Sequence, residues 1–345
     1  MNLTKINKRI SLGIILISLT STNLVTYYFT NKKNHASTDT NAAESNSILD
    51  GNRNCSYKVQ RLNGYDYIKP ILFVDNQCES DNLNAVKQNI ISMIDNYKNA
   101  GVLNSASVYL KEYAGNGWIG INADEKFWPG SLMKVPQLIA FLKMEEANPG
   151  LLNKVLSYDR PYIIDKKVKY ESKSIQLGQQ YTIRELLRYM ITYSDNNATS
   201  LLFTNMDLKV FKKVFTDFGM IAPDLGAQNY PMSAKEFTYF MRALYNASYL
   251  SNKNSEFATE LLGKCNFKNG IVASLPPHTK IAHKFGEAGD PLEKQLNESA
   301  IIYLNDNPYI ITIMTKGKDP AKLPEVIKQI STLAYQNMLN NPASL

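Results

Sequence analysis

A serine and a lysine at positions i and i+3, Ser131 and Lys134, have the spacing that best fits chemistry in this chain. Residues three apart share one face of a helix. Gly130, just before the serine, places it at the start of that helix, where backbone N–H groups are still free. A hydroxyl with an amine base beside it and a positive helix end beneath it meets the requirements for a nucleophile that forms an acyl-enzyme.

Two further motifs follow in the chain, and the three motifs together are a more specific signal of function than the first one alone. Ser-x-x-Lys alone predicts no more than a solvated helix turn, and Ser194-Asp195-Asn196 alone would equally be a helix N-cap. Later comes Lys284-Phe285-Gly286, on a stretch that alternates like a strand. The order Ser-x-x-Lys, Ser-Asp-Asn, then lysine and glycine on a strand is a signature of serine acyl-transfer enzymes.

With these motifs in this order, the chain resembles the serine β-lactamase and penicillin-binding protein superfamily, and the class A β-lactamases most closely. The resemblance runs from about Leu83 to the C-terminus and includes the segment Tyr181–Leu187 that leads to Ser194. It implies an α+β fold, in which an antiparallel sheet flanked by terminal helices joins an all-helical lobe. The active site would lie between the two, with no cofactor and no metal.

The resemblance implies a role for each of four catalytic residues. Ser131 would attack a carbonyl carbon, and Lys134 would take the hydroxyl proton, which requires a neutral amine. Ser194 would relay a proton to the leaving nitrogen. Lys284 would hold Ser194 in place electrostatically. Asp195, between the motif residues, is expected to be structural rather than catalytic.

The substrate-binding residues that the resemblance implies are Asn196, Phe285, Gly286 and Glu287. Asn196 would hold the substrate amide, and the backbone N–H groups of Ser131 and Glu287 would form the oxyanion hole. Phe285 stands where the family has a threonine or serine whose hydroxyl helps bind a substrate carboxylate. Glu287 shares its strand face by period-2 alternation. Its charge would repel a substrate carboxylate unless it is protonated or paired.

A third departure from the family pattern concerns hydrolysis of the acyl-enzyme. Class A enzymes carry a glutamate on a long loop between the second and third motifs, and it activates the deacylating water. Between residues 205 and 235 this chain has only the acids Asp207, Asp217 and Asp224. Asp224 or Gln228 would have to position the water instead. We therefore expect the residues for acylation to be present and hydrolysis of a β-lactam acyl-enzyme to be slow.

Three functions are compatible with these residues. The first is an exported active-site serine hydrolase, class A β-lactamase-like, that hydrolyses an amide or a β-lactam. The second is a penicillin-binding D-Ala-D-Ala carboxypeptidase or transpeptidase, acting on a peptidoglycan-derived peptide, with slow β-lactam deacylation. The third is a catalytically idle wall-binding pseudoenzyme, which Phe285 and Glu287 favour. The complete set of catalytic residues speaks against the third.

Composition and charge limit the remaining possibilities. The chain has 345 residues, 44% hydrophobic and 20% charged, as in a soluble globular body with a full core. The net charge of +7 is dispersed and no nucleic-acid motif occurs, so we expect no binding to nucleic acid. We also expect a monomer. No Cys-x-x-Cys occurs, which argues against a metal site. Cys55 and Cys78 could form a disulfide if the chain is exported, and Cys265 is expected to be a small buried hydrophobe.

The N-terminus carries a basic segment followed by about 20 mostly apolar residues, from Ile10 to Phe29, close to the span of a bilayer. No A-x-A site follows closely, so residues 1–33 favour an uncleaved signal anchor over a cleaved signal peptide. Residues 34–82 would be a flexible tether and a short N-terminal extension. Residues 83–345 would be the catalytic domain, held at the membrane outside the cytoplasm.

Hydrophobic periodicity predicts the elements that must position the motifs. Leu83, Val86, Ile90, Ile94 and Tyr97 mark one helical face, and Val326, Ile330, Leu333 and Met338 mark a last helix. Strands are expected at 106–110 and 118–121 around a Gly-Asn-Gly turn, and at 281–287, 300–304 and 309–314. The helical lobe is expected at about 131–265. Strands at both ends of the domain imply one sheet closed by distant segments.

Overall fold

The computed structural model describes residues 55–162, 169–170, 173–227, 230–304 and 307–340. The predicted membrane segment, most of the predicted tether and Gln228 lie outside these residues. Within the described ranges, none of the helices combines the length and the apolar character that a membrane crossing requires.

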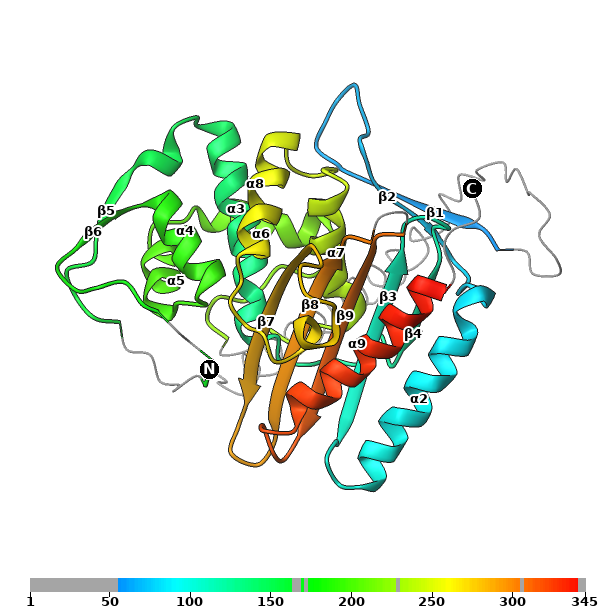
Figure 1. Ribbon diagram of the computed structural model, residues 1–345. Coiled ribbons are helices and arrows are strands. Elements are labelled where there is room, and N and C mark those ends of the chain that lie inside the picture. The colour runs from blue at the N-terminus through cyan, green and yellow to red at the C-terminus, as the bar shows by residue number, and fades with distance from the viewer. Residues whose placement is uncertain (1–54, 163–168, 171–172, 228–229, 305–306, 341–345) are drawn as a thin grey trace, which may run out of the picture. The chain divides into compact units, whose positions relative to one another are not determined.

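A five-stranded antiparallel sheet, in the order β4-β3-β9-β8-β7, forms one half of the molecule (Figure 1). Its strands are β3 (Ser105–Glu112), β4 (Trp118–Ile121), β7 (Ile281–Gly289), β8 (Lys294–Ile302) and β9 (Tyr309–Gly317). The early strand β3 pairs with the late strand β9 along its whole length. The predicted closure of one sheet by distant segments is therefore confirmed, and β7, which carries Lys284, is an edge strand.

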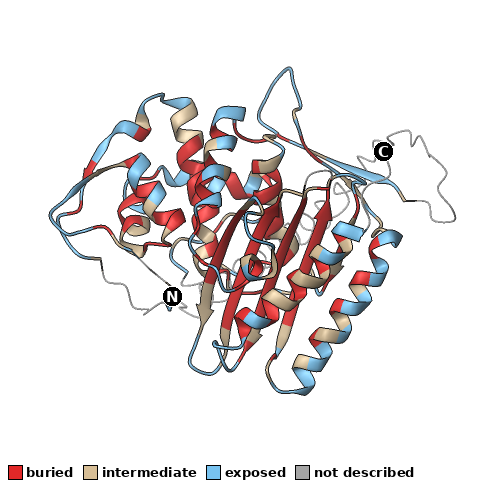
Figure 2. Cartoon of the chain, in the orientation of Figure 1, coloured by how far each residue is buried: buried red, intermediate tan, exposed pale blue. Residues whose placement is uncertain are grey.

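Two terminal helices, α2 (Asn84–Asn99) and α9 (Leu323–Asn340), cover one face of this sheet (Figure 1). Val86, Ile90 and Ile94 bury the predicted face of α2. They share a hydrophobic core with the α9 side chains and with sheet residues such as Val108 and Ile311. Figure 2 shows β7, β8 and β9 buried along most of their length, as expected for strands covered on both faces.

The other face of the sheet meets the helical lobe. Its helices are α3 (Lys134–Ala147), α4 (Ile183–Thr192), α5 (Asn196–Phe203), α6 (Leu208–Asp217), α7 (Ala234–Tyr245) and α8 (Asn252–Gly263). Helix α7 contacts β3, β8 and β9. Its Thr238 hydroxyl lies 2.7 Å from that of Thr312, which in turn lies 2.7 Å from that of Ser299. This buried chain of hydroxyls joins the lobe to two strands.

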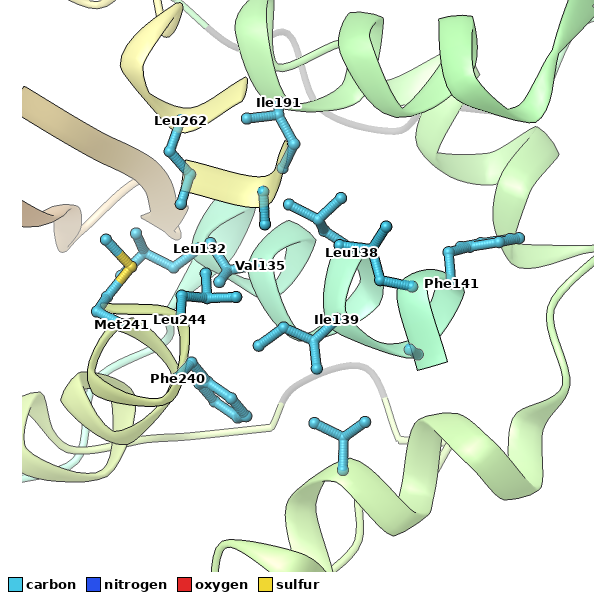
Figure 3. Close-up of a cluster of buried hydrophobic side chains, with 14 of the residues drawn as sticks. Leu132, Val135, Leu138, Ile139, Phe141, Ile191, Phe240, Met241, Leu244 and Leu262 are labelled. Atoms are coloured by element: carbon cyan, nitrogen blue, oxygen red, sulfur yellow. The ribbon is translucent and has the colours of Figure 1, made fainter. Parts of the chain in front are cut away.

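Helix α3 runs through the middle of the lobe. All its residues from Lys134 to Leu142 are buried, so it lacks the polar face of a surface helix. Figure 3 shows its side chains among Ile191 of α4, Leu262 of α8 and a row from α7. A helix surrounded in this way provides a rigid base for Lys134, the residue at which it begins.

A separate two-stranded ribbon, β1 (Tyr57–Arg61) and β2 (Ile71–Asn76), precedes the sheet. Cys55 and Cys78 form the disulfide that the sequence allowed, and it closes the base of the ribbon. Asp75 binds the buried Arg242 of α7 through two hydrogen bonds of 2.6 and 3.1 Å. The ribbon is thereby fastened to the helical lobe.

Two elements differ from the sequence-based prediction. Strand β8 begins at Lys294, well before the predicted residue 300. The first residues of this strand are polar, so they do not look like a strand in sequence, but in the fold their side chains have buried partners. The Asn297 side chain, for example, donates to the Trp128 carbonyl at 2.9 Å and accepts from the Thr315 N–H at 3.3 Å. The largely helical middle also contains a short ribbon, β5 (Val155–Ser157) and β6 (Gln180–Thr182).

Candidate active site

Ser131 lies in a 3₁₀ turn, η2 (Gly130–Met133), which leads directly into α3. Two glycines bring this turn against the edge strand β7. A Cβ on Gly130, whose φ is +55°, would lie 2.1 Å from the Glu287 carbonyl oxygen, and one on Gly286 would lie 2.1 Å from the Pro129 carbonyl oxygen. The same Gly286 position is 3.0 Å from the Ser131 nitrogen. The backbones of Ser131 and Glu287 are thus adjacent, as an oxyanion hole built from their N–H groups would need.

Ser194 occupies the turn between α4 and α5 in a left-handed conformation, with φ +57°. For a non-glycine residue this costs about 1–3 kcal/mol and persists only where the surroundings enforce it. Asp195, the next residue, holds the turn in this conformation through its side chain. Its buried carboxylate accepts from the Asn197 N–H at 2.9 Å, the Ser174 hydroxyl at 2.8 Å and the Ile175 N–H at 2.8 Å.

Lys134 is almost wholly buried, and its Nζ is the centre of a polar cluster. It lies 3.0 Å from Ser131 Oγ, 2.8 Å from Asn196 Oδ1 and 3.1 Å from Ser194 Oγ, and it donates to the Ser194 carbonyl. That carbonyl and the Asn196 oxygen can only accept. A neutral amine that donates to both has its lone pair left for a hydroxyl proton. The geometry therefore suits Lys134 as the base for Ser131.

Lys284 approaches the same cluster from the sheet. Its Nζ donates to Ser194 Oγ at 2.9 Å and to the Phe285 carbonyl at 3.0 Å, and it lies 4.1 Å from the centre of the Phe285 ring. Burial lowers the pKa of Lys284 to about 8. Ser194 Oγ thus stands between two amines, a position from which a hydroxyl can pass a proton.

The structure brings together all four residues assigned catalytic roles from the sequence, and Asn196 with them. They come from the start of α3, the turn before α5 and the edge of the sheet, which are the motif positions of an active-site serine acyl-transfer enzyme. Ser131 itself is partly exposed, so a substrate can reach it.

A model of the beta-lactamase enzyme family matches residues 86–338. The chain belongs to this family. An extended-spectrum beta-lactamase PER-1 from Pseudomonas aeruginosa is 24% identical over 248 residues, 65% of this chain and 80% of that protein. The structure of PBP-A has a TM-score of 0.63 at 21% identity, over 75% of this chain and 97% of that chain. A class A beta-lactamase from Mycobacterium abscessus has a TM-score of 0.61 at 21% identity, over 73% and 98%. The likeness to these structures confirms the predicted fold.

Phe285 and Glu287, the residues at which the sequence departs from the expected family pattern, each have partners near the site. The Phe285 ring is buried and stacks on Phe267, with centroids 4.4 Å apart. The Glu287 carboxylate accepts from the backbone N–H groups of Lys169 at 3.3 Å and Tyr170 at 3.1 Å. Burial raises the pKa of Glu287 above its usual value. No sequence signal selects Phe267, Lys169 or Tyr170, because each lies in a non-periodic segment far from the motifs.

The loop acids considered for deacylation in this beta-lactamase-family protein each have a local partner. Asp207 caps α6 by accepting from the Lys209 N–H at 2.8 Å. Asp217 binds Lys213 and the Tyr249 hydroxyl, and Asp224 accepts from the Gly226 N–H at 2.9 Å. These contacts give each of the three carboxylates a structural role, two within their own turns and one, Asp217, also with Tyr249 beyond α7.

A buried ion pair supports β7 from behind the site. His283 Nδ1 lies 2.7 Å from Glu298 Oε1, and its Nε2 lies 3.3 Å from the Cys265 carbonyl oxygen. Both partners are acceptors, so the ring is an imidazolium. Burial alone would lower the pKa of His283, but its contacts with Cys265 and Glu298 raise it to about 10. Glu298 also accepts from the Ile271 N–H at 2.8 Å.

Glu298→Ala is expected to lower the free energy of unfolding by about 3–5 kcal/mol, because it leaves a buried imidazolium without its partner. Urea unfolding at pH 7 measures this. The raised pKa of His283 means that the stabilisation is complete below its ordinary pKa of 6.5 and is lost as pH rises through about 10. Glu256→Ala, at an exposed position of α8, is the control. Equal midpoints for both variants would contradict the prediction.

Proposed function

We propose that this protein is an exported active-site serine hydrolase that forms a covalent acyl-enzyme on Ser131 with a β-lactam or a peptidoglycan-derived amide. The observation that carries the proposal is the contact of 3.0 Å between Lys134 Nζ and Ser131 Oγ. It lies within a network that also holds Ser194 and Lys284. A nucleophile, its base and a proton relay in contact are the parts that acyl transfer requires.

The acylation step follows from these contacts. Ser131 Oγ bonds to the carbonyl carbon while Lys134 takes its proton. The negative charge on the carbonyl oxygen is stabilised by the N–H groups of Ser131 and Glu287. The bond from carbon to nitrogen then breaks as Ser194 gives its proton to the nitrogen. Ser194 regains a proton from Lys134, whose Nζ lies 3.1 Å from its Oγ, so charge and protons balance.

A second function, a penicillin-binding peptidase with a long-lived β-lactam acyl-enzyme, is favoured by the loop acids. Asp207, Asp217 and Asp224 are all held by partners of their own, Lys209, Lys213 with Tyr249, and Gly226, so none is an evident substitute for a deacylating glutamate. One similar structure, a single-residue mutant of PBP-A, is described as an acyl-enzyme complex with penicillin-G. An idle wall-binding pseudoenzyme is the third possibility, and the assembled network speaks against it.

Export is part of the proposal. The basic and apolar N-terminal segment would direct the chain to the membrane. The disulfide between Cys55 and Cys78 supports an oxidising compartment outside the cytoplasm. A membrane-held enzyme of this kind would meet cell-wall peptides or antibiotics there.

The test is to mix the protein with a fluorescent penicillin and to follow label on Ser131 and turnover of a chromogenic cephalosporin together. We expect stoichiometric label with slow turnover. Ser131→Ala should abolish both. Rapid turnover would replace the peptidase function with that of an efficient β-lactamase. Absence of label and turnover, unchanged in Ser131→Ala, would favour the idle pseudoenzyme.

A further inference from the structure

The ribbon of β1 and β2 concentrates exposed apolar side chains. Of the fourteen large hydrophobic side chains that the described residues expose, seven belong to this ribbon and its hairpin tip. They are Tyr57, Val59, Tyr65, Tyr67, Ile68, Ile71 and Val74. Figure 2 shows the projecting end of the hairpin as exposed. Apolar side chains gathered on one protruding element mark an interaction surface, whereas singly scattered ones do not.

The inner face of the ribbon is fixed to the helical lobe. Phe73 is buried and stacks on Phe218 and Tyr239, with ring centroids 6.0 and 5.4 Å apart. Asp75 binds the buried guanidinium of Arg242 through two hydrogen bonds. The ribbon therefore cannot turn its inner face outward without losing these contacts, and any partner must meet its outer face or its tip.

The outer face of the ribbon is exposed and largely apolar. Val59 lies directly opposite Val74, and Arg61 directly opposite Ile71, so the members of each pair share a face. Tyr57 lies two positions before Val59 and joins them by strand alternation. All five side chains are exposed. This face combines aliphatic and aromatic groups with a basic residue at the end near the tip.

The hairpin tip adds further aromatic groups. Tyr67 is 99% exposed, and Tyr65 and Ile68 on either side of it are more than half exposed. Tyrosine is enriched where proteins meet the interface between membrane and water, because its ring is apolar and its hydroxyl is polar. A protruding tip with two tyrosines and an isoleucine has the composition of such an interfacial segment.

The exposed charges of the ribbon are mostly positive. Lys58, Arg61 and Lys69 are exposed, and Asp66 is the exposed acid among the ribbon residues 57–76. The other acid of this range, Asp75, is neutralised by Arg242. Basic side chains beside apolar and aromatic ones are typical of segments that lie on bilayers containing anionic lipids. Two such ribbons packed face to face would instead bring like charges together, which disfavours a second copy as the partner.

The position of the ribbon in the chain favours a membrane as its partner. The predicted anchor ends at residue 33, and Cys55 begins the described chain at the base of the ribbon. Residues 34–54, even fully extended, would span no more than about 70 Å. In an anchored protein the bilayer is thus always within a short distance, and the resulting high effective concentration allows weak interfacial contacts to form.

We infer that the β1–β2 ribbon docks on the membrane surface, with Tyr65, Tyr67 and Ile68 in the interfacial layer and the basic side chains at anionic headgroups. This goes beyond the proposed function and rests only on its membrane anchor. Since the inner face of the ribbon is fixed to α7, docking would set the orientation of the catalytic domain toward the bilayer instead of leaving it to turn freely on its tether.

The test uses the full chain in vesicles of acyl-brominated phosphatidylcholine with roughly one-third phosphatidylglycerol, which supplies the negative charge. Tyr67→Trp places an indole at the tip, and bromine quenches indoles that enter the interface. After subtraction of the wild-type emission, we expect the introduced indole to lose about half of its emission relative to unbrominated vesicles, because interfacial segments reach the acyl boundary. Leu292→Trp is the control. Leu292 is 84% exposed and lies in the turn between β7 and β8, which Figure 1 shows at the opposite end of the molecule from the ribbon tip.

Two second-site variants in the Tyr67→Trp background sharpen the test. Ile68→Asp puts a negative charge into the apolar tip and should restore most of the emission. Val155→Asp makes a comparable change at an exposed position of β5 and should not. Vesicles without phosphatidylglycerol should quench less, because the three basic side chains then lose their partner.

Each outcome bears on a different part of the reasoning. Protein that floats with the vesicles while its Tyr67→Trp indole stays unquenched would overturn the inference alone. Protein that does not float with them would overturn the anchor and the inference together, whereas penicillin label on Ser131 reports on the hydrolase separately. An indole emission in detergent that shifts to the blue with rising protein concentration would assign the ribbon to a second copy instead of a membrane.

Discussion

Lys134→Met is expected to slow acylation of Ser131 by roughly 10³-fold, the contribution typical of a positioned general base. The amine lies 3.0 Å from Ser131 Oγ, and the other acceptors around it leave its lone pair for that hydroxyl. A thioether of similar length fills the space but cannot accept the proton. Stopped-flow measurement with a fluorescent penicillin, across a range of concentrations, gives the acylation rate.

The matched control is Lys143→Met, the same substitution on the same helix. Lys143 is half-buried, binds Glu146 at 3.0 Å and is not part of the network around Ser131. Its acylation rate should stay within about twofold of the wild type, because surface ion pairs contribute little. Equal rates for Lys134→Met and the control would mean that another group deprotonates Ser131.

Lys284→Met is expected to stabilise the fold at pH 7 while it slows acylation by roughly 10²-fold. Burial lowers the pKa of Lys284 from 10.5 to about 8, so folding disfavours its charged form. The cost is complete below pH 8 and falls away as pH rises to 10.5, because over that interval the unfolded chain binds more protons. The shift corresponds to about 3 kcal/mol, an upper limit on the gain since the variant also loses two hydrogen bonds.

Urea unfolding at pH 7 and pH 10.5 measures this effect. The advantage of Lys284→Met over the wild type should shrink between the two pH values. Lys264→Met, at the exposed residue that follows α8 and pairs with Glu260, should show no comparable change. A variant less stable than the wild type at pH 7 would show that the bonds of Lys284 outweigh its desolvation.

Hydrophobic periodicity was sufficient to predict the helices and strands that bury one face. The apolar spacing in α2 and α9 predicted helices that the structure places over the sheet, and alternation predicted β3. The start of β8 was missed because Lys294, Gln295, Asn297 and Glu298 look like a loop in sequence. Their partners are far away in the chain, as with His283 for Glu298, and such pairings cannot be seen in local spacing.

The candidate site was predictable where its residues belong to motifs. Ser131, Lys134, Ser194 and Lys284 were chosen by type and order, and they meet in space. The surroundings of Phe285 were not predictable, because Tyr170 and Phe267 come from irregular segments whose course depends on tertiary packing. The left-handed backbone of Ser194 was equally hidden, since sequence favours glycine or asparagine for that conformation.

The pairing of β3 with β9 has a consequence for how the enzyme is made. The first long strand of the sheet pairs with its neighbour β4 on one side, but its partner on the other side lies close to the C-terminus, so that edge stays open until nearly the whole chain has been synthesised. The helical lobe precedes β7 in the chain, but Lys284 reaches Ser194 only when β7 has docked. Non-local pairing of this kind slows folding. A chain that lost its last segment would therefore keep its nucleophile and still lack a working catalytic centre.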